Sequence, residues 1–107
     1  MTDKKIVLTT TGSREEAGKI AIALVERRLA ACVNLVAIES VYRWKDAVEN
    51  AQEWLLVIKT TADAFEEVHA AIKELHSYEL PECIVVPIEN GSEEYLDWIA
   101  DNVVSED

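Results

Sequence analysis

Residues 31–48 read ACVNLVAIESVYRWKDAV, and no helical period runs through them. Apolar residues alternate on one parity as far as Ala37, whereas Tyr42 and Trp44 lie on the opposite parity. This switch predicts either a strand with both faces partly buried or a strand with a bulge near residues 38–40. A strand over the whole segment would be roughly 50–60 Å long, about three times the usual length.

The segment that follows predicts the other half of a long β-hairpin. Asn50-Ala51-Gln52 is the predicted turn, and Trp54–Thr60 is a second apolar strand. Flanking helices of about 13–15 residues would each cover only about 20 Å of the hairpin. Its far end, rich in valine and aromatic residues, would be left bare. We expect another copy of the chain to cover it, which predicts a homo-oligomer.

Shorter elements are expected on both sides of the hairpin. They are a strand over Ile6–Thr10, a helix from the cap Ser13 to about Leu29, a helix opened by Asp63, a strand over Cys83–Ile88 and a last helix capped by Ser92. Pro87 predicts an edge position for the fourth strand. The order βαββαβ plus a terminal helix predicts a ferredoxin-like α+β fold, with helices on one face of an antiparallel sheet and a single domain over residues 1–107.

The charge balance limits the possible partners. The chain has 10 basic and 21 acidic residues, a net charge of −11, and such a surface repels the phosphates of nucleic acids. No apolar stretch approaches the ~20 residues of a membrane span, and the run Ile6–Leu8 is too short for a signal peptide. We therefore expect a cytoplasmic protein that binds neither nucleic acid nor membrane. Cys32 and Cys83 are expected to be free thiols.

Residues 76–82, HSYELPE, form the densest cluster of chemically active groups. An imidazole, a phenol and two carboxylates stand beside a proline that stiffens the connection. Two interpretations are open. The cluster is either a polar connection between helix and strand, or a pocket for a ligand or metal that uses His76 with Glu82 and, as a further ligand, Tyr78. His69, two turns earlier on the helix, is expected at the surface.

Three further side chains on the hairpin are candidates. Lys59 ends an apolar run, where a lone buried charge is costly. It should either pair with a carboxylate of the chain or recognise an anionic ligand. Tyr42 and Trp44 project from one face of the long strand, and they are either anchors of an oligomer interface or walls of a pocket between subunits.

One enzyme class shares the predicted order of elements. Acylphosphatases use an arginine in the first loop and an asparagine on the second strand, and Arg14 and Asn34 occupy such positions. The loop before Arg14 lacks the several glycines of a phosphate cradle, however, and the negative net charge disfavours a phosphate substrate. We expect the chain not to be an enzyme of this kind.

From Ile6 to Ile99, the chain resembles the CutA family of divalent-cation tolerance proteins. The matching blocks are Val7–Thr10, Leu29–Asn34, Ser40–Trp44, Ile58–Thr61, His76–Glu82 and Tyr95–Ile99. The resemblance implies a ferredoxin-like homotrimer with interlocked hairpins, an arrangement shared with nitrogen-regulatory PII proteins. It also implies a link to divalent metals, copper above all.

The resemblance extends to some of the metal-binding residues. In the copper-binding bacterial members, a cysteine stands at the position of Thr9 and a second histidine at Leu75, so His76 alone of that set is present here. The resulting hypothesis is a homotrimer that holds copper(II) or another divalent cation weakly through His76, Tyr78 and Glu82.

The cleft between subunits completes this hypothesis, with Lys59, Tyr42 and Trp44 as its lining. The alternative is a PII-like sensor that binds a small anionic or nucleotide ligand between subunits. The chain lacks the basic and glycine-rich loops that such a ligand requires.

Overall fold

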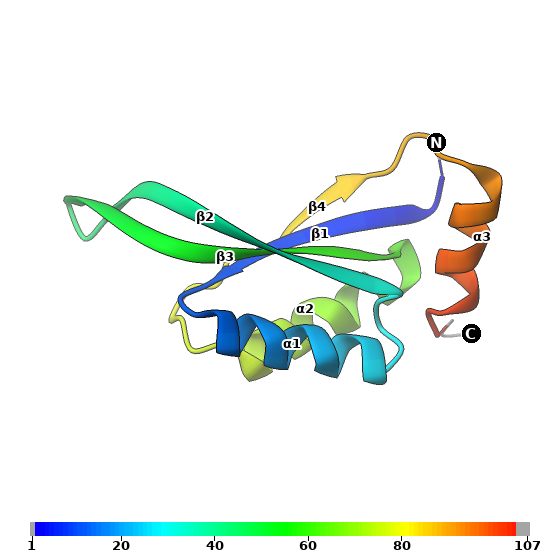
Figure 1. Ribbon diagram of the computed structural model, residues 1–107, viewed down its shortest axis with the longest axis horizontal. Coiled ribbons are helices and arrows are strands. Elements are labelled where there is room, and N and C mark those ends of the chain that lie inside the picture. Colours follow the sequence, from blue (N-terminus) through cyan, green and yellow to red (C-terminus); the bar gives the residue numbers. More distant parts are fainter. Residues whose placement is uncertain (1, 105–107) are drawn as a thin grey trace.

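The computed structural model describes residues 2–104, shown in Figure 1. Its elements are β1 (Lys4–Thr11), α1 (Arg14–Glu26), β2 (Cys32–Trp44), β3 (Ala47–Thr61), a 3₁₀ helix (Ala62–Ala64), α2 (Phe65–Leu75), β4 (Ile84–Pro87) and α3 (Glu93–Asp101). The predicted α+β class and the long central hairpin are confirmed. None of the helices within residues 2–104 is long and apolar enough to cross a membrane.

One four-stranded antiparallel sheet, in the order β2-β3-β1-β4, forms the centre of the molecule. α1 and α2 cover one face of the sheet, and α3 lies at the end of the sheet away from the hairpin tip (Figure 1). The main core lies between the sheet and the two helices. Its fully buried side chains include Val7, Leu56 and Ile58 from the strands and Leu24 and Ile72 from the helices.

The hairpin turns earlier than the sequence predicts. β2 and β3 pair without interruption from Cys32↔Lys59 to Trp44↔Ala47, so the turn consists of Lys45 and Asp46. Both have positive φ angles, 50° and 68°, as a two-residue type I′ turn requires. The predicted turn at 50–52 is therefore wrong, because these residues lie inside β3.

The bulge is also absent from β2. Its residues 38–40 pair one to one with β3, so the alternative that holds is a regular strand with side chains of both parities partly buried. β2 has 13 residues, or roughly 43 Å at ~3.3 Å each, which is shorter than the predicted 50–60 Å. The early turn accounts for this difference.

The predicted helix caps are confirmed at two of three positions. The Ser13 and Ser92 hydroxyls accept hydrogen bonds from the third residue beyond them, at 3.1 Å and 3.3 Å. Asp63 does not cap α2, because it lies inside the short 3₁₀ turn that precedes the helix. α1 ends at Glu26 instead of Leu29, since Arg28 adopts a left-handed conformation, φ 60°, and closes the helix as a Schellman turn.

Within residues 2–104, most of the sheet face opposite α1 and α2 is left uncovered. Side chains alternate along a strand, so the neighbours of the buried Leu56 and Ile58 point to this second face. It carries Val36 and, on the edge strand β4, Ile84 and Val86, all exposed. β4 pairs only with β1, which confirms the predicted edge position of Pro87.

Candidate functional site

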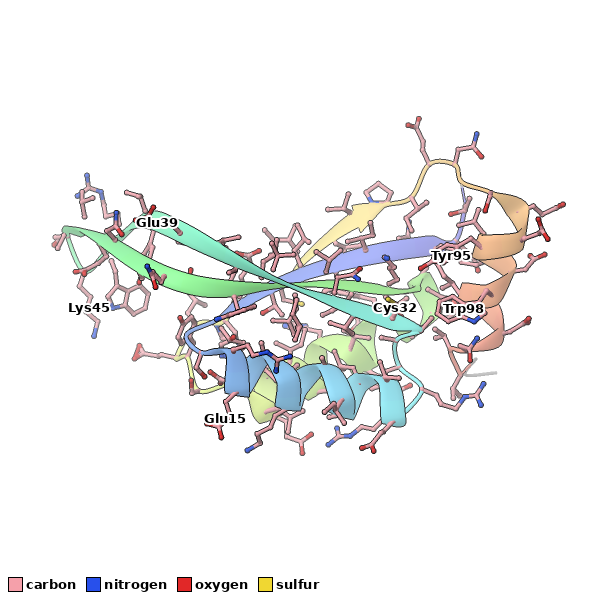
Figure 2. The ribbon with its side chains drawn as sticks, viewed as in Figure 1. Glu15, Cys32, Glu39, Lys45, Tyr95 and Trp98 are labelled. Atoms are coloured by element: carbon pink, nitrogen blue, oxygen red, sulfur yellow. The ribbon has the colours of Figure 1, made fainter. Side chains whose placement is uncertain are left out.

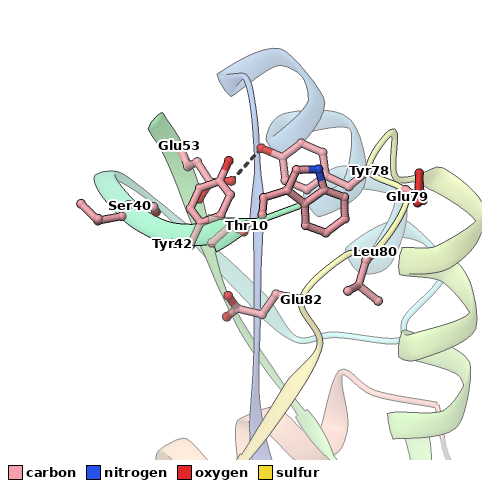
Figure 3. Close-up of a pocket in the computed structure, with 10 residues that line it drawn as sticks. Thr10, Ser40, Tyr42, Glu53, Tyr78, Glu79, Leu80 and Glu82 are labelled. Carbon is pink, nitrogen blue, oxygen red and sulfur yellow. Dashed lines mark hydrogen bonds between the residues drawn. The ribbon is translucent and has the colours of Figure 1, made fainter. Parts of the chain in front are cut away.

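A cleft of about 650 Å³ opens where the β2–β3 hairpin leaves the sheet (Figure 3). Three segments line it: the end of β1, the hairpin, and the loop between α2 and β4. The lining residues are Thr10 of β1, then Ser40, Val41, Tyr42, Trp44 and Glu53 of the hairpin, and Tyr78, Glu79, Leu80 and Glu82 of the loop. The cleft thus joins parts of the chain that are far apart in sequence.

The loop is fixed in place by His76, whose side chain is fully buried. Its Nδ1 accepts a hydrogen bond from the backbone N–H of Tyr78 at 3.0 Å. Nδ1 therefore carries no proton, and Nε2, at 2.6 Å from the Thr10 carbonyl oxygen, is the donor to that oxygen. An imidazole with both nitrogens engaged connects the loop to β1.

A second attachment comes from α1. The Glu16 carboxylate accepts hydrogen bonds from the Ser77 backbone N–H at 2.6 Å and from the Ser77 hydroxyl at 3.0 Å. Glu16 lies in the first turn of α1, where a negative charge is favoured by the helix dipole. The loop is thereby held between helix and strand, which positions the next residue, Tyr78.

Tyr78 crosses from the loop to the hairpin. Its hydroxyl donates a hydrogen bond to Glu53 Oε2 at 2.6 Å, drawn as a dashed line in Figure 3. A Cβ atom at Gly12 would lie 3.2 Å from this hydroxyl oxygen, so the ring fits closely because Gly12 has no side chain. Burial and then the bond to Glu53 raise the pKa of Tyr78 far above its ordinary value. The phenol therefore stays protonated and remains a donor.

Glu53 is the most unusual charge in the cleft. Only 6% of the residue is exposed, and among residues 2–104 neither of its oxygens forms an ion pair; Oε1 accepts no hydrogen bond from these residues and is open to solvent. Burial and then the charge of Glu53 raise the pKa of Glu82 above 4.5. No lysine or arginine of the described residues lines the cleft. Its electrostatics therefore favour a cation and disfavour an anion.

The comparisons with known proteins agree with this fold. The CutA1 divalent ion tolerance protein family matches residues 5–102. The chain belongs to the CutA1 family. It is 49% identical over 100 residues to the divalent-cation tolerance protein CutA of Thermus thermophilus, covering 92% of this chain and 97% of the relative. The CutA protein of Archaeoglobus fulgidus is 42% identical over 97 residues, with 91% and 95% covered.

A solved structure supports the same assignment. The divalent cation tolerance protein (Cut A1) from Thermus thermophilus superimposes with a TM-score of 0.92 at 48% identity, covering 94% of this chain and 99% of that one. The family names describe divalent-cation tolerance and no enzymatic reaction. This CutA1 chain is therefore a divalent-cation tolerance protein by family.

The CutA1 fold brings together four of the six predicted site residues. Tyr42, Trp44, Tyr78 and Glu82 all line the cleft. His76 lies behind the cleft lining and packs against Tyr78 with its ring tilted, at 4.7 Å between ring centroids. It supports the site, and its assignment as a metal ligand stays a prediction.

Lys59 lies near the C-terminal end of β3, close to α3. Its Nζ is 3.4 Å from the Tyr95 hydroxyl and 5.6 Å from the centre of the Tyr95 ring. The carboxylate partner that the sequence suggested is absent from the described residues around it. Lys59 therefore joins the other predicted cleft residues only if a second copy brings it there.

Sequence reasoning missed Glu53. The misplaced turn put residues 50–52 in a loop, so the glutamate next to them was not predicted to lie on a strand. Once the turn is placed at residues 45–46, Glu53 lies opposite Ile38 in the ladder and on the face of Leu55. A glutamate among apolar neighbours on a strand was the available signal.

A metal ion would not find a complete site in one CutA1 chain. Among residues 2–104, no three His, Cys, Asp or Glu side chains come close enough to hold one. Both imidazole nitrogens of His76 are engaged, and the Tyr78 phenol is committed to Glu53. The cleft carboxylates Glu53, Glu79 and Glu82 do not come together as a group of three among the described residues, so one chain offers fewer ligands than divalent metals usually take from protein.

Proposed function

We propose that this CutA1 chain functions as a homotrimer of ferredoxin-like subunits that binds divalent cations, copper(II) among them, weakly in the acidic cleft. The observation that carries the proposal is the largely buried Glu53 carboxylate, which shares the cleft with Glu82, has one oxygen open to solvent and has no cationic partner within the described residues. A buried charge is stable only when it is compensated, and a cation from solution provides that compensation.

Glu82 and the free oxygen of Glu53 are the proposed donors. Tyr78 holds Glu53 in place, and His76 holds the loop that carries Tyr78. His76 itself becomes a ligand only if the loop moves and releases Nδ1 from the Tyr78 N–H. With two carboxylates from one chain, the ion keeps water or takes further ligands from a second copy, so the affinity is low.

The proposed trimer is supported by the surfaces that one chain leaves open. The face opposite α1 and α2 is apolar, both β2 and β4 have a free edge, and Val41 and Val48 near the hairpin tip are 66% and 67% exposed. Apolar faces and free strand edges of this kind are usually covered by another copy. A stable monomer in sedimentation equilibrium would contradict this part of the proposal.

A copper titration by calorimetry tests the metal assignment. Wild type should bind copper(II), and Glu53→Gln and Glu82→Gln should each weaken binding by about tenfold or more, since each removes one of the two proposed donor carboxylates. Glu93→Gln, on the exposed first turn of α3, is the matched control and should bind like wild type. Equal affinity in all four proteins, or none in any, would contradict the assignment.

Electron paramagnetic resonance on the copper-loaded protein separates the two ligand sets. Oxygen coordination without nitrogen coupling is expected while His76 keeps its hydrogen bonds. Nitrogen coupling that His76→Ala abolishes would instead place the imidazole in the ligand set.

The alternatives have less support. A PII-like sensor of an anionic ligand needs basic side chains. Among the described residues that line the cleft, all the charged side chains are acidic. For acylphosphatase chemistry, Arg14 begins α1 on the covered face of the sheet, whereas Asn34 pairs with Val57 and points to the opposite face. We therefore propose a function without catalysis and expect no hydrolysis of acetyl phosphate.

A further inference from the structure

We propose that the acidic cleft is a binding site for a primary alkylammonium ligand, best matched by a short diamine, whose charges face Glu53 and Glu82 and whose carbon chain lies against the aromatic walls. The inference uses the same carboxylates as the proposed metal site but requires no metal. It assigns the cleft an organic ligand.

The first argument is the unfilled hydrogen-bonding capacity of Glu53. Its Oε2 accepts the Tyr78 hydroxyl at 2.6 Å, whereas Oε1 has no hydrogen-bond partner within the described part of the chain and the residue is only 6% exposed. A ligand that completes this carboxylate must supply both a positive charge and an N–H donor. A primary ammonium has three such donors, and a quaternary ammonium has none.

The second argument is the character of the walls. Tyr42, Trp44 and Tyr78 present aromatic rings, and Val41 and Leu80 add aliphatic surface. Ring faces attract ammonium groups, and apolar side chains pack against methylene groups. A cleft of about 650 Å³ is also in the usual size range for small organic ligands, roughly 300–1,000 Å³.

The chain itself shows one such contact at the edge of this region. The Lys45 ammonium lies 5.6 Å from the centre of the Trp44 ring, within the ~6 Å at which a ring attracts a cation. Trp44 therefore already has an alkylammonium neighbour on the hairpin. The proposed ligand would make the same kind of contact inside the cleft.

The third argument is the number of charges. Glu53 and Glu82 line the same cleft, and two like charges in one site repel each other. A second ammonium on the same ligand relieves that repulsion, which a single charge does only in part. This favours a diamine over a monoamine.

The test is calorimetric titration of 1,4-diaminobutane into protein freed of metal by a chelator, at pH 7.5 and 0.15 M salt, where diffuse attraction to the acidic surface is screened. We expect one diamine per chain and an affinity about tenfold or more lower in Glu53→Gln. Glu93→Gln should bind like wild type, and tetramethylammonium should bind several-fold more weakly than the diamine.

Tyr42→Leu provides a second variant if Glu53→Gln disturbs the fold. Tyr42 lies on the hairpin outside the core, and its loss should lower diamine affinity several-fold while circular dichroism stays unchanged. Three results would overturn the inference: no binding to wild type, equal affinity in wild type and the variants that fold, or tetramethylammonium binding as tightly as the diamine.

Copper titrations on the same samples keep the two proposals apart. Copper binding without diamine binding removes this inference and leaves the metal proposal standing. Diamine binding without copper binding does the reverse. If both bind, the diamine should weaken copper binding in proportion to its occupancy, because both use Glu53 and Glu82, and independent binding would overturn the shared placement.

Discussion

Two positions on β3 place opposite charges on the same face of the sheet. Glu53 lies in the middle of the strand, just beyond the end of β1, and meets Tyr78, whereas Lys59 lies near the α3 end and meets Tyr95. Figure 2 shows Tyr95 on α3, at the end of the molecule opposite Lys45 and the hairpin tip. Each charge therefore has a tyrosine partner and no ion pair among the described residues.

The two contacts differ in their exposure to water. The Lys59–Tyr95 contact is long, 3.4 Å, and exposed, so water hydrates the ammonium. Glu53 is only 6% exposed, its contact with Tyr78 is short, 2.6 Å, and its Oε1 has no hydrogen-bond partner among the described residues but is open to solvent. The same type of pair is thus a surface contact at one site and a largely buried carboxylate without a cationic partner at the other.

Removing His76, which holds the loop that carries Tyr78, should have the largest effect on stability. His76→Ala would leave the Tyr78 N–H and the Thr10 carbonyl without partners and open a cavity, so we expect a loss of about 3 kcal/mol in the free energy of unfolding. Urea denaturation measures it. His69→Ala, whose ring stacks on Phe65 at the surface of α2 with 5.8 Å between centroids, is the control and should lose less than about 1 kcal/mol. Equal losses would show that the loop does not depend on His76.

Removing the hydroxyls of Tyr78 and Tyr95 compares the Glu53 and Lys59 contacts directly. Tyr78→Phe leaves a buried carboxylate without its donor and should cost about 1–3 kcal/mol. Tyr95→Phe should change stability by less than about 0.5 kcal/mol, because water replaces the hydroxyl at Lys59. Thermal unfolding of both variants in the same buffer measures the two stability costs. A cost at Tyr95 that matches the cost at Tyr78 would contradict the comparison.

The smallest expected effect is a pH dependence at Glu82. Its raised pKa means that the folded protein binds this proton more tightly than the unfolded chain does, so stability falls as pH rises from 4.5 through the raised value. Glu82→Gln should therefore be more stable than wild type above this window and equal to it below pH 4.5. Melting temperatures of both proteins between pH 4 and pH 8 measure the difference, with Glu93→Gln as the control. A difference that does not vary with pH would contradict the assignment.

Local signals predicted the features that local chemistry decides. Ser13 and Ser92 cap their helices because each hydroxyl reaches a backbone N–H three residues away, and Pro87 lies on an edge strand because it cannot donate to a ladder. The hairpin turn escaped prediction, since Lys45 and Asp46 are not the asparagine and glycine that usually indicate left-handed turn residues. Because the turn was predicted at residues 50–52 instead of 45–46, Glu53 was not recognised as a strand residue.

By itself, the sequence determined the α+β class, the long hairpin, and the cluster of residues 76–82 as the region to inspect, because hydrophobic period and turn chemistry act between near neighbours. Only the tertiary structure decided that His76 lies behind the cleft with both nitrogens engaged and that Glu53 and Glu82 share the cleft. The physical reason is desolvation. Whether a carboxylate is an ordinary surface charge or a site for a cation depends on which distant segment covers it, and here the covering residue is Tyr78, which comes from another part of the chain.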